Sequence, residues 1–321
     1  MSASILALLK QNNDFISGEQ ISEMLNISRT AVWKNIGKLR LQGFVIEAIT
    51  NKGYCLISCP DMLFPELIET SNTLIGNKIY HYTTLESTNI TAKAEAFKGA
   101  KEGSVFITEE QTAGKGRMGK EWISGKDTVC FSVLLRPMLS PAEITTLTLV
   151  AGLAVAQAIR NITSLPAMIK WPNDIIVNSK KLCGILTEMA AEAERIAFAV
   201  VGIGINVNDT AFCDELKDKA TSIFLENGEA FSRVDLLKEI LVQLEKYYFL
   251  FLEKGITPIL SKYSALCATL EKEITAKVRG ETVKGIARAI SPNGSLIIET
   301  QNGEMHLSSG EVSVRGLLGY T

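Results

Sequence analysis

The first sixty residues combine helical and alternating apolar patterns. Val32, Ile36 and Leu39 fall at positions i, i+4 and i+7, which places them on one buried face of a helix. Two shorter helical patterns precede this helix, and Ser28 is suited to cap its N-terminus. Apolar runs on both sides of the turn residues 50–53 then predict a β-hairpin. Three helices followed by a hairpin predict a winged helix-turn-helix, which we assign to the segment 1–60.

The rest of the chain shows two further patterns. Over residues 61–270, apolar strand-like runs alternate with two long helical patterns at 141–162 and 233–253, which predicts a mixed α/β domain. Over residues 271–321, short strands separated by glycine- and asparagine-containing turns predict a small β-barrel. The expected fold class of the whole chain is therefore α+β, with three domains.

The composition limits the location of the protein and its partners. Hydrophobic residues make up 46% and charged residues 21% of the 321-residue chain, as in ordinary globular proteins. The formal net charge of −2 excludes attraction of the whole chain to nucleic acid, but the first sixty residues hold six basic and four acidic side chains. The cysteines lack zinc or disulfide spacing, and no apolar run reaches about 20 residues. We expect a soluble cytoplasmic protein with free thiols and no membrane contact.

The third predicted helix exposes a polar and basic face. Its N-terminal half carries Ser28, Arg29, Thr30, Trp33 and Lys34, which lie off the buried face. A recognition helix uses such residues at its N-terminal end to meet base edges and phosphates. These five residues are therefore candidates for DNA binding. The alternative is a small helical domain with a solvated basic face that contacts another protein, and Trp33 is also suited to packing.

Residues 111–122 alternate glycines with cations. Gly114, Gly116 and Gly119 are interleaved with lysines and with Arg117. Glycines let a backbone approach a ligand closely, and the cations suit phosphate. The spacing is not that of a Walker loop, and no capped helix follows as in a dinucleotide-binding fold. For this segment alone, a phosphate-binding loop and a solvated basic loop both remain open.

Three more segments carry candidate chemistry. Asn173 and Asp174 follow a proline at the end of an apolar run, where they form either a turn or part of a metal–phosphate site. Lys181 enters an apolar strand just before Gly184, and burial of its ammonium is costly unless it faces a polar pocket or solvent. Glycines in the apolar run 202–207 indicate that something approaches the backbone closely.

Together, these segments resemble the bifunctional biotin–protein ligases. The residues that carry the resemblance are Ser87-Thr88-Asn89, GKGRMGKEW at 114–122, KWPNDI at 170–175, KLCGIL at 181–186 and GIGINV at 202–207. Their order and spacing fit throughout residues 80–210, and the flanking domains extend the resemblance to essentially the whole chain. The resemblance implies a class II synthetase-like ligase domain, an SH3-like barrel and an ATP-dependent biotin–[acetyl-CoA-carboxylase] ligase. Such an enzyme forms biotinyl-5′-AMP and also represses biotin genes.

The resemblance implies roles for individual residues. Biotin would be bound by Ser87, Thr88, Asn89, Gln111, Gly114, Lys115, Gly116, Arg117, Lys181, Gly184 and Gly204. ATP or the adenylate would be bound by Arg117, Trp122, Asn173, Lys181, Asn206 and Arg315, with Lys181 and Arg117 as the catalytic residues. Asp174 is a candidate Mg²⁺ ligand, and the segment 208–232 is a candidate cover over the adenosine. The implied partners are a biotin carboxyl carrier protein of acetyl-CoA carboxylase or another biotin-dependent carboxylase, operator DNA, and a second copy in a homodimer.

The sequence departs from the usual loop of this family, since lysine replaces arginine at positions 115 and 120. Lysine keeps the charge but loses the planar two-pronged donor, which changes little where the backbone N–H makes the contact. Cys183 stands where a small apolar residue is usual, and it is interpreted as a packing residue. Two rivals remain, a lipoate–protein ligase and a metabolite-sensing transcription regulator without ligase activity. The Ser87-Thr88 pair favours biotin, and Lys181 with Arg117 favours an enzyme.

Overall fold

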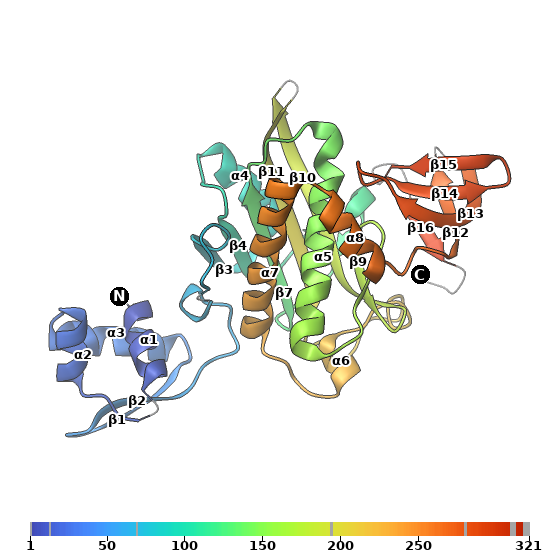
Figure 1. Ribbon diagram of the computed structural model, residues 1–321. Coiled ribbons are helices and arrows are strands. Elements are labelled where there is room, and N and C mark those ends of the chain that lie inside the picture. The colour runs from blue at the N-terminus through green and yellow to red at the C-terminus, as the bar shows by residue number, and fades with distance from the viewer. Residues whose placement is uncertain are drawn as a thin grey trace. The chain divides into compact units, whose positions relative to one another are not determined.

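The computed structural model describes residues 2–12, 14–68, 70–192, 195–278, 281–308 and 313–316 (Figure 1). It divides into two compact units, Met1–Glu69 and Thr70–Thr321. The second unit holds both the predicted α/β domain and the C-terminal strands. The domain boundaries expected near residues 60 and 270 stay predictions.

The first unit consists of three helices and a β-hairpin. Its elements are α1 (Ser2–Gln11), α2 (Gly18–Leu25), α3 (Arg29–Leu41), β1 (Val45–Ile49), β2 (Gly53–Ser58) and the 3-10 helix η1 (Pro65–Leu67). Val32, Ile36 and Leu39 are at most 1% exposed, so the predicted stripe is the core-facing side of α3. The Ser28 side chain accepts a hydrogen bond from the backbone N–H of Ala31 and caps α3. The predicted helices and hairpin are confirmed.

The second unit is built on a seven-stranded mixed sheet. In spatial order, its strands are β3 (Ile79–Leu85), β4 (Val105–Gln111), β7 (Thr128–Leu135), β11 (Arg195–Asn206), β10 (Lys180–Glu192), β9 (Asp174–Val177) and β8 (Met168–Lys170). β3 and β4 run parallel, and the other neighbouring strands pair antiparallel. The interior strand β7 is buried along its whole length, because both faces of the sheet are covered.

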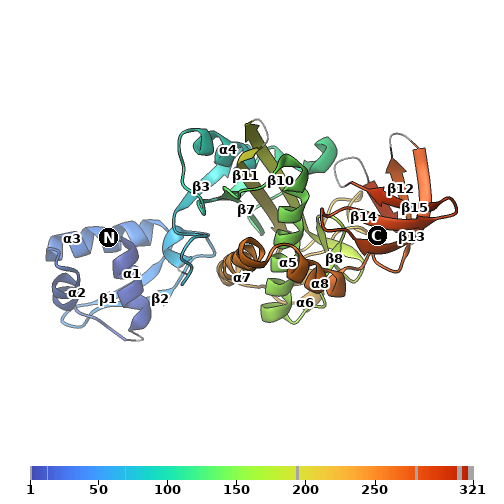
Figure 2. The same cartoon turned by 45° about the horizontal axis from the view of Figure 1, so that its top comes forward.

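Helices cover the two faces of this sheet. On one face, α4 (Thr88–Phe97) packs through Ala92 and Ala96 against the strand residue Phe106. On the other, α5 (Ile144–Thr163), α7 (Arg233–Lys254) and α8 (Thr257–Leu266) lie together (Figures 1 and 2). The connections contain β5 (Gly114–Lys115), η2 (Arg117–Gly119), β6 (Glu121–Trp122), η3 (Pro141–Glu143) and α6 (Ile223–Asn227). Pro141–Thr163 is long and apolar enough to cross a membrane, but 72% of its most apolar window is buried, as in a core helix.

The C-terminal strands form a separate antiparallel sheet. Its order is β15 (Gly303–Leu307), β14 (Leu296–Thr300), β13 (Glu281–Ile290), β12 (Glu273–Val278) and β16 (Ser313–Gly316). Ile274, Leu296 and Ile298 are at most 2% exposed and form its core. The Trp171 Nε1–H donates to the Gly294 carbonyl at 3.1 Å and joins this sheet to the larger one. The predicted α+β class is confirmed, whereas closure of the small sheet as an SH3-like barrel stays a prediction.

Candidate active site

A pocket lies on the α4 face of the mixed sheet, between the first turn of α4 and the glycine–cation segment. It is lined by Ser87, Thr88, Asn89, Gln111, Lys115, Gly116, Arg117, Trp122, Asn173, Lys181, Gly184, Ile185, Leu186, Gly202, Ile203 and Gly204. Most of the predicted biotin and nucleotide residues therefore meet in one place, although they come from segments far apart in the sequence. Ile185, Leu186 and Ile203 had received no role from the sequence, and Gly202 had been named only as one of the glycines of the run 202–207.

Glycines on β10 and β11 form the floor of this pocket. Gly184 and Gly204 are cross-strand partners. A Cβ atom at Gly204 would lie 2.5 Å from the Trp122 indole, and one at Gly202 would lie 2.2 Å from Asn89 Oδ1. Real Cβ atoms do not approach other atoms so closely, so any larger residue would displace these neighbours. The glycines thus keep a flat surface on which side chains, or a ligand, contact the strand backbone.

Polar groups at the start of α4 form one end of the pocket. The Thr88 N–H donates to Gln111 Oε1 at 2.9 Å, which fixes the orientation of that side-chain amide. The Ser132 Oγ lies 2.7 Å from Thr88 Oγ1 and 2.6 Å from Asn89 Oδ1. Ser132 is fully buried, and Thr88 and Asn89 are each 4% exposed. Sequence reasoning missed Ser132, because a lone serine in an apolar strand carries no signal of its own.

The glycine–cation segment folds as a small hairpin in which β5 pairs with β6. The Gly116 N–H donates to the Lys120 carbonyl at 2.7 Å, and Met118 adopts a positive φ of 56° at the tip. The Arg117 guanidinium turns inward and donates to Asn173 Oδ1 at 2.8 Å. Burial lowers the pKa of Arg117, an effect that the Asp174 carboxylate opposes. Lys115 is exposed but also lines the pocket, whereas Lys120 is exposed and lies outside the lining, so Lys115 and Arg117 are the cations of this hairpin that reach the pocket.

The Lys181 ammonium lies beside Gly184 on the floor of the pocket, 3.2 Å from where a Cβ atom of that glycine would be. Its Nζ is 2.7 Å from Asp174 Oδ1 and 5.6 Å from the centroid of the Trp122 ring. The neighbouring Asn173 is held by a hydrogen bond from its Nδ2 to the Ile185 carbonyl at 3.0 Å. A carboxylate therefore occupies the position beside the ammonium that the anionic end of a ligand would take.

Three predicted residues whose side chains the structure describes lie outside the pocket lining. Gly114 is covered by Trp122, whose carbonyl would be 2.4 Å from a Cβ atom at that position. Asn206 donates to the Thr221 carbonyl at 3.0 Å, beside the backbone pairing of Lys181 with residues 219–221. Asp174 contacts Lys181 at the pocket edge. The Arg315 side chain falls outside the described residues.

The cysteines near the pocket are packing residues. Cys130 and Cys183 are at most 1% exposed, and burial raises the pKa of both thiols. A thiol that resists ionisation is a poor nucleophile. The packing interpretation of Cys183 therefore agrees with its position, and covalent catalysis by these two residues is disfavoured.

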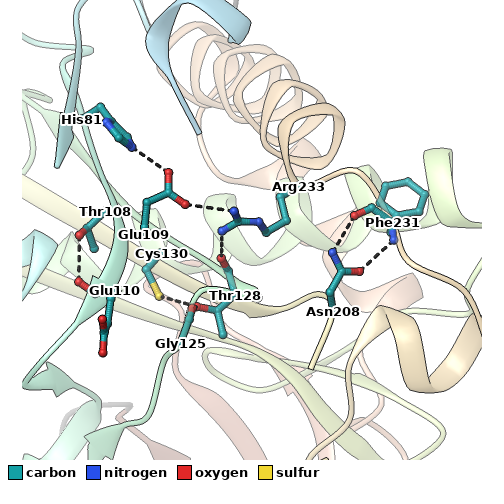
Figure 3. A network of polar contacts seen from close by, with 10 residues as sticks. All are labelled: His81, Thr108, Glu109, Glu110, Gly125, Thr128, Cys130, Asn208, Phe231 and Arg233. Carbon is teal, nitrogen blue, oxygen red and sulfur yellow. Dashed lines mark hydrogen bonds and ion pairs between the residues drawn. The ribbon is translucent and has the colours of Figure 1, made fainter. Parts of the chain in front are cut away.

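A buried ion-pair network on the opposite face of the sheet anchors the segments around the pocket (Figure 3). Glu109 contacts Arg233 at 3.0 Å and His81 at 2.7 Å, and Arg233 also donates to the Thr128 carbonyl at 3.1 Å. The Asn208 side chain exchanges two hydrogen bonds with the Phe231 backbone. These contacts hold both ends of the segment 208–231 close to the start of β7, the strand that follows the glycine–cation hairpin in the chain.

The predicted DNA-binding face lies on α3 in the first unit. Arg29, Thr30, Trp33 and Lys34 are exposed, and the Trp33 side chain is 66% exposed. Trp33 therefore does not pack into the core of this unit. The arrangement leaves four side chains available to a partner at the N-terminal half of the helix.

Comparison with known proteins identifies the family. The Biotin/lipoate A/B protein ligase family matches residues 81–206, an HTH domain matches 2–55, and the biotin protein ligase C-terminal domain matches 269–315. The bifunctional ligase/repressor BirA of Bacillus subtilis is 39% identical over 94% of both chains. The chain belongs to the bifunctional biotin ligase/repressor family. Its relative in Escherichia coli K12 is 30% identical and covers 97% of this chain and 96% of its own.

Membership in this family confirms the predicted ligase activity and the helix-turn-helix DNA-binding domain. Among solved structures, the biotin protein ligase of Aquifex aeolicus in complex with biotin and ATP has a TM-score of 0.65 at 30% identity. That likeness covers 75% of this chain and 99% of the Aquifex chain. The assignment of individual site residues stays a prediction.

Proposed function

We propose that this chain activates biotin with ATP as biotinyl-5′-AMP and transfers it to a lysine of a biotin carboxyl carrier protein. The observation that carries the proposal is that Lys181 and Arg117 line one glycine-floored pocket with Thr88 at its polar end. The Aquifex relative is described in complex with biotin and ATP, and a Mycobacterium tuberculosis relative is named biotin–[acetyl-CoA-carboxylase] ligase. These names support acetyl-CoA carboxylase as the source of the carrier protein.

In the first step, a carboxylate oxygen of biotin attacks the α-phosphorus of ATP, and pyrophosphate leaves. Negative charge grows on the phosphoryl oxygens, so the residues act mainly by positioning and charge stabilisation. The biotin carboxylate and an α-phosphate oxygen compete with Asp174 for the ammonium of Lys181. Lys181 then contacts both of these ligand groups. Arg117 holds the hairpin over the adenylate through Asn173, and the glycines of β10 and β11 support the biotin tail.

In the second step, the neutral amine of the carrier lysine attacks the carbonyl carbon of the mixed anhydride, and AMP leaves. A proton is lost from the attacking nitrogen as the amide forms. The chain's task is to keep the adenylate from water until the carrier arrives. Trp122, Asn206 and the segment 208–232 are assigned to the nucleotide side, and Arg315 is assigned to closure of that side.

Magnesium enters the proposal as part of the MgATP substrate. Among the described residues, no three histidine, cysteine, aspartate or glutamate side chains converge as they would at a resident metal site. Asp174, the candidate ligand, is paired with Lys181. The ion supplies charge neutralisation on the phosphates when pyrophosphate departs. Chelation with EDTA should therefore stop the first step without changing the fold.

Pyrophosphate exchange tests the proposed reaction. With MgATP and labelled pyrophosphate, exchange should depend on biotin and not on lipoate, and addition of a carrier domain should yield biotin on one lysine. Exchange that depends on lipoate would assign the chain to the rival ligase. Absence of exchange with either acid would leave a sensor without ligase activity.

Replacement of Arg117 by glycine should release the adenylate. The substitution removes the charged hydrogen bond to Asn173, and such a bond is worth roughly ten- to a hundredfold in an equilibrium constant. We expect free biotinyl-5′-AMP to accumulate and to label bystander lysines on serum albumin, as measured by blotting with streptavidin. Lys120→Gly, at an exposed position of the same hairpin, is the control. Labelling confined to the carrier in Arg117→Gly would contradict the role of the hairpin.

We further propose that the adenylate-bound chain forms a homodimer in the cytoplasm and binds a two-fold symmetric operator through Ser28, Arg29, Thr30, Trp33 and Lys34. Two helix-turn-helix units read paired half-sites when a dimer presents them at the right spacing. A gel shift with upstream DNA of biotin genes should require biotin and ATP together, and Arg29→Ala should weaken it. A shift that ignores both ligands would remove the regulatory part of the proposal.

A further inference from the structure

A chain of polar side chains leads from the surface of the ligase domain to the pocket. It runs from Lys93 through Glu188, Asn89 and Ser132 to Thr88. Lys93 Nζ lies 2.5 Å from Glu188 Oε1, and Asn89 Nδ2 donates to Glu188 Oε2 at 2.7 Å. The remaining oxygen–oxygen distances are 2.6 Å from Asn89 to Ser132 and 2.7 Å from Ser132 to Thr88. The last three residues are almost completely buried.

The acceptors around Asn89 fix its amide in one orientation. Its nitrogen faces two acceptors, the Glu188 carboxylate and the Leu186 carbonyl, at 2.7 and 3.3 Å. A carboxylate and a carbonyl only accept hydrogen bonds, so the nitrogen must point toward them. Asn89 Oδ1 is thereby turned toward Ser132. Gly202 leaves the space for this amide, because a Cβ atom there would lie 2.2 Å from Oδ1.

Hydrogen counting then sets the remaining directions. An amide oxygen only accepts, so the single hydroxyl hydrogen of Ser132 is used at Asn89. The single hydrogen of the Thr88 hydroxyl has two acceptors in reach, Ser132 Oγ at 2.7 Å and Gln111 Oε1 at 3.2 Å. The shorter contact with Ser132 needs this hydrogen, because Ser132 has none left to give. Gln111 Oε1 remains satisfied by the Thr88 backbone N–H at 2.9 Å. Thr88 lines the pocket, and its hydroxyl oxygen is left with lone pairs alone.

We propose that Glu188 is a positioning residue that, through Asn89 and Ser132, makes Thr88 Oγ1 a dedicated acceptor and so selects ligands with a ring N–H at that end of the pocket. This inference rests on the proposed function, because a ureido ring presents such an N–H. A dithiolane or a ring oxygen presents only lone pairs, which would face the lone pairs of Thr88 without a hydrogen between them. Discrimination against such ligands is thus set by a carboxylate that does not touch the ligand.

The ion pair between Lys93 and Glu188 allows the proposal to be tested by Glu188→Gln, in which an NH₂ group replaces one carboxylate oxygen. In Glu188→Gln, the ammonium of Lys93 attracts the amide oxygen, which turns the new NH₂ group toward Asn89. The NH₂ groups of the new side chain and of Asn89 would then face each other with no acceptor between them. The side-chain amide of Asn89 must turn over to remove this conflict, and each hydrogen bond from Asn89 to Thr88 then changes direction. Thr88 then receives a hydrogen from Ser132 and loses acceptor capacity toward the pocket. In Glu188→Gln with Lys93→Glu, the new carboxylate attracts that NH₂ group, and the original direction returns.

The experiment compares biotin with two analogues, in each of which one ureido N–H is replaced by oxygen. Calorimetry on the full chain without ATP gives the affinity ratio of biotin to each analogue. For the wild type, we expect one analogue to bind roughly ten- to a hundredfold more weakly than biotin through loss of the Thr88 bond. In Glu188→Gln, this ratio should fall below about threefold, because Thr88 no longer distinguishes N–H from oxygen. The double variant should regain most of it.

Two further variants separate positioning from a structural role. Lys93→Met removes the ion pair but leaves Glu188 as an acceptor, so the ratio should stay within about twofold of wild type. Ser132→Ala breaks the chain in its middle and should also lower the ratio, which keeps the test decisive if Glu188→Gln fails to fold. An unchanged ratio in a folded Glu188→Gln or Ser132→Ala variant, or a double variant no better than Glu188→Gln, would overturn the inference. If the wild type binds biotin and both analogues equally well, the inference on Glu188 is overturned while the proposed function stands. If the wild type does not bind biotin, the proposed function is overturned as well.

Discussion

Lys181→Ala should form biotinyl-5′-AMP roughly 10²- to 10³-fold more slowly than the wild type while it still binds biotin. The ammonium is the charge on β10 that lines the pocket, and its loss removes stabilisation of the developing phosphoryl charge. Asp174 would also lose a partner at 2.7 Å, which leaves a negative charge beside an anionic substrate. Single-turnover formation of the adenylate measures the step, and calorimetry measures biotin binding.

Lys180→Ala is the matched control for this variant. Lys180 is the preceding residue of the same strand and is absent from the pocket lining. Its replacement should leave the rate of adenylate formation within about twofold, because successive side chains of a strand point to opposite faces. A Lys181→Ala variant with the rate of wild type would refute the assignment of the catalytic lysine.

Gly204→Val should weaken biotin binding by about a hundredfold or more. The first side-chain atom would lie 2.5 Å from the Trp122 indole, so the indole must move into the space assigned to the biotin tail. Valine suits an extended backbone, and overpacking of this kind costs about 1–3 kcal/mol of stability, so we expect a folded variant. Calorimetry with biotin and thermal unfolding monitored by circular dichroism separate the two effects.

Gly125→Val is the control, because a Cβ atom at Gly125 meets nothing within 4 Å. It follows Trp122 by three residues in the connection to β7. Biotin binding near the wild-type value in a folded Gly204→Val variant would show that the glycine floor does not contact the ligand. The predicted roles of Gly184 and Gly204 would then have to be withdrawn.

Local patterns were sufficient where the fold depends on neighbouring residues. The stripe of Val32, Ile36 and Leu39 predicted the buried side of α3, because helical periodicity determines which side chains share a face. The helical pattern predicted at 233–253 is α7 at Arg233–Lys254. Strand-like runs were also recognised over residues 61–270, but their ends were not, since pairing with other strands extends or shortens each strand.

Contacts between distant segments could not be read from the sequence. The motifs placed Lys181 and Asp174 in one site, but only the register of β10 with β9 brings their charges together. Ser132 and Glu188 gave no signal, because their importance depends on Asn89 lying between them. The sequence offered 208–232 only as a candidate cover over the adenosine and did not place it in the fold. Its position is set by non-local bonds, such as that from Asn206 to the Thr221 carbonyl.

The reciprocal hydrogen bonds between Asn208 and Phe231 join the two stems of a long connection at its base. The stretch between them returns to the sheet at residues 219–221, where its backbone pairs with Lys181. Insertions and deletions should therefore accumulate between residues 210 and 218 among relatives, ahead of that pairing, without loss of the glycine floor. Evolution can thus remodel one loop beside the proposed nucleotide side while the proposed biotin side stays constant.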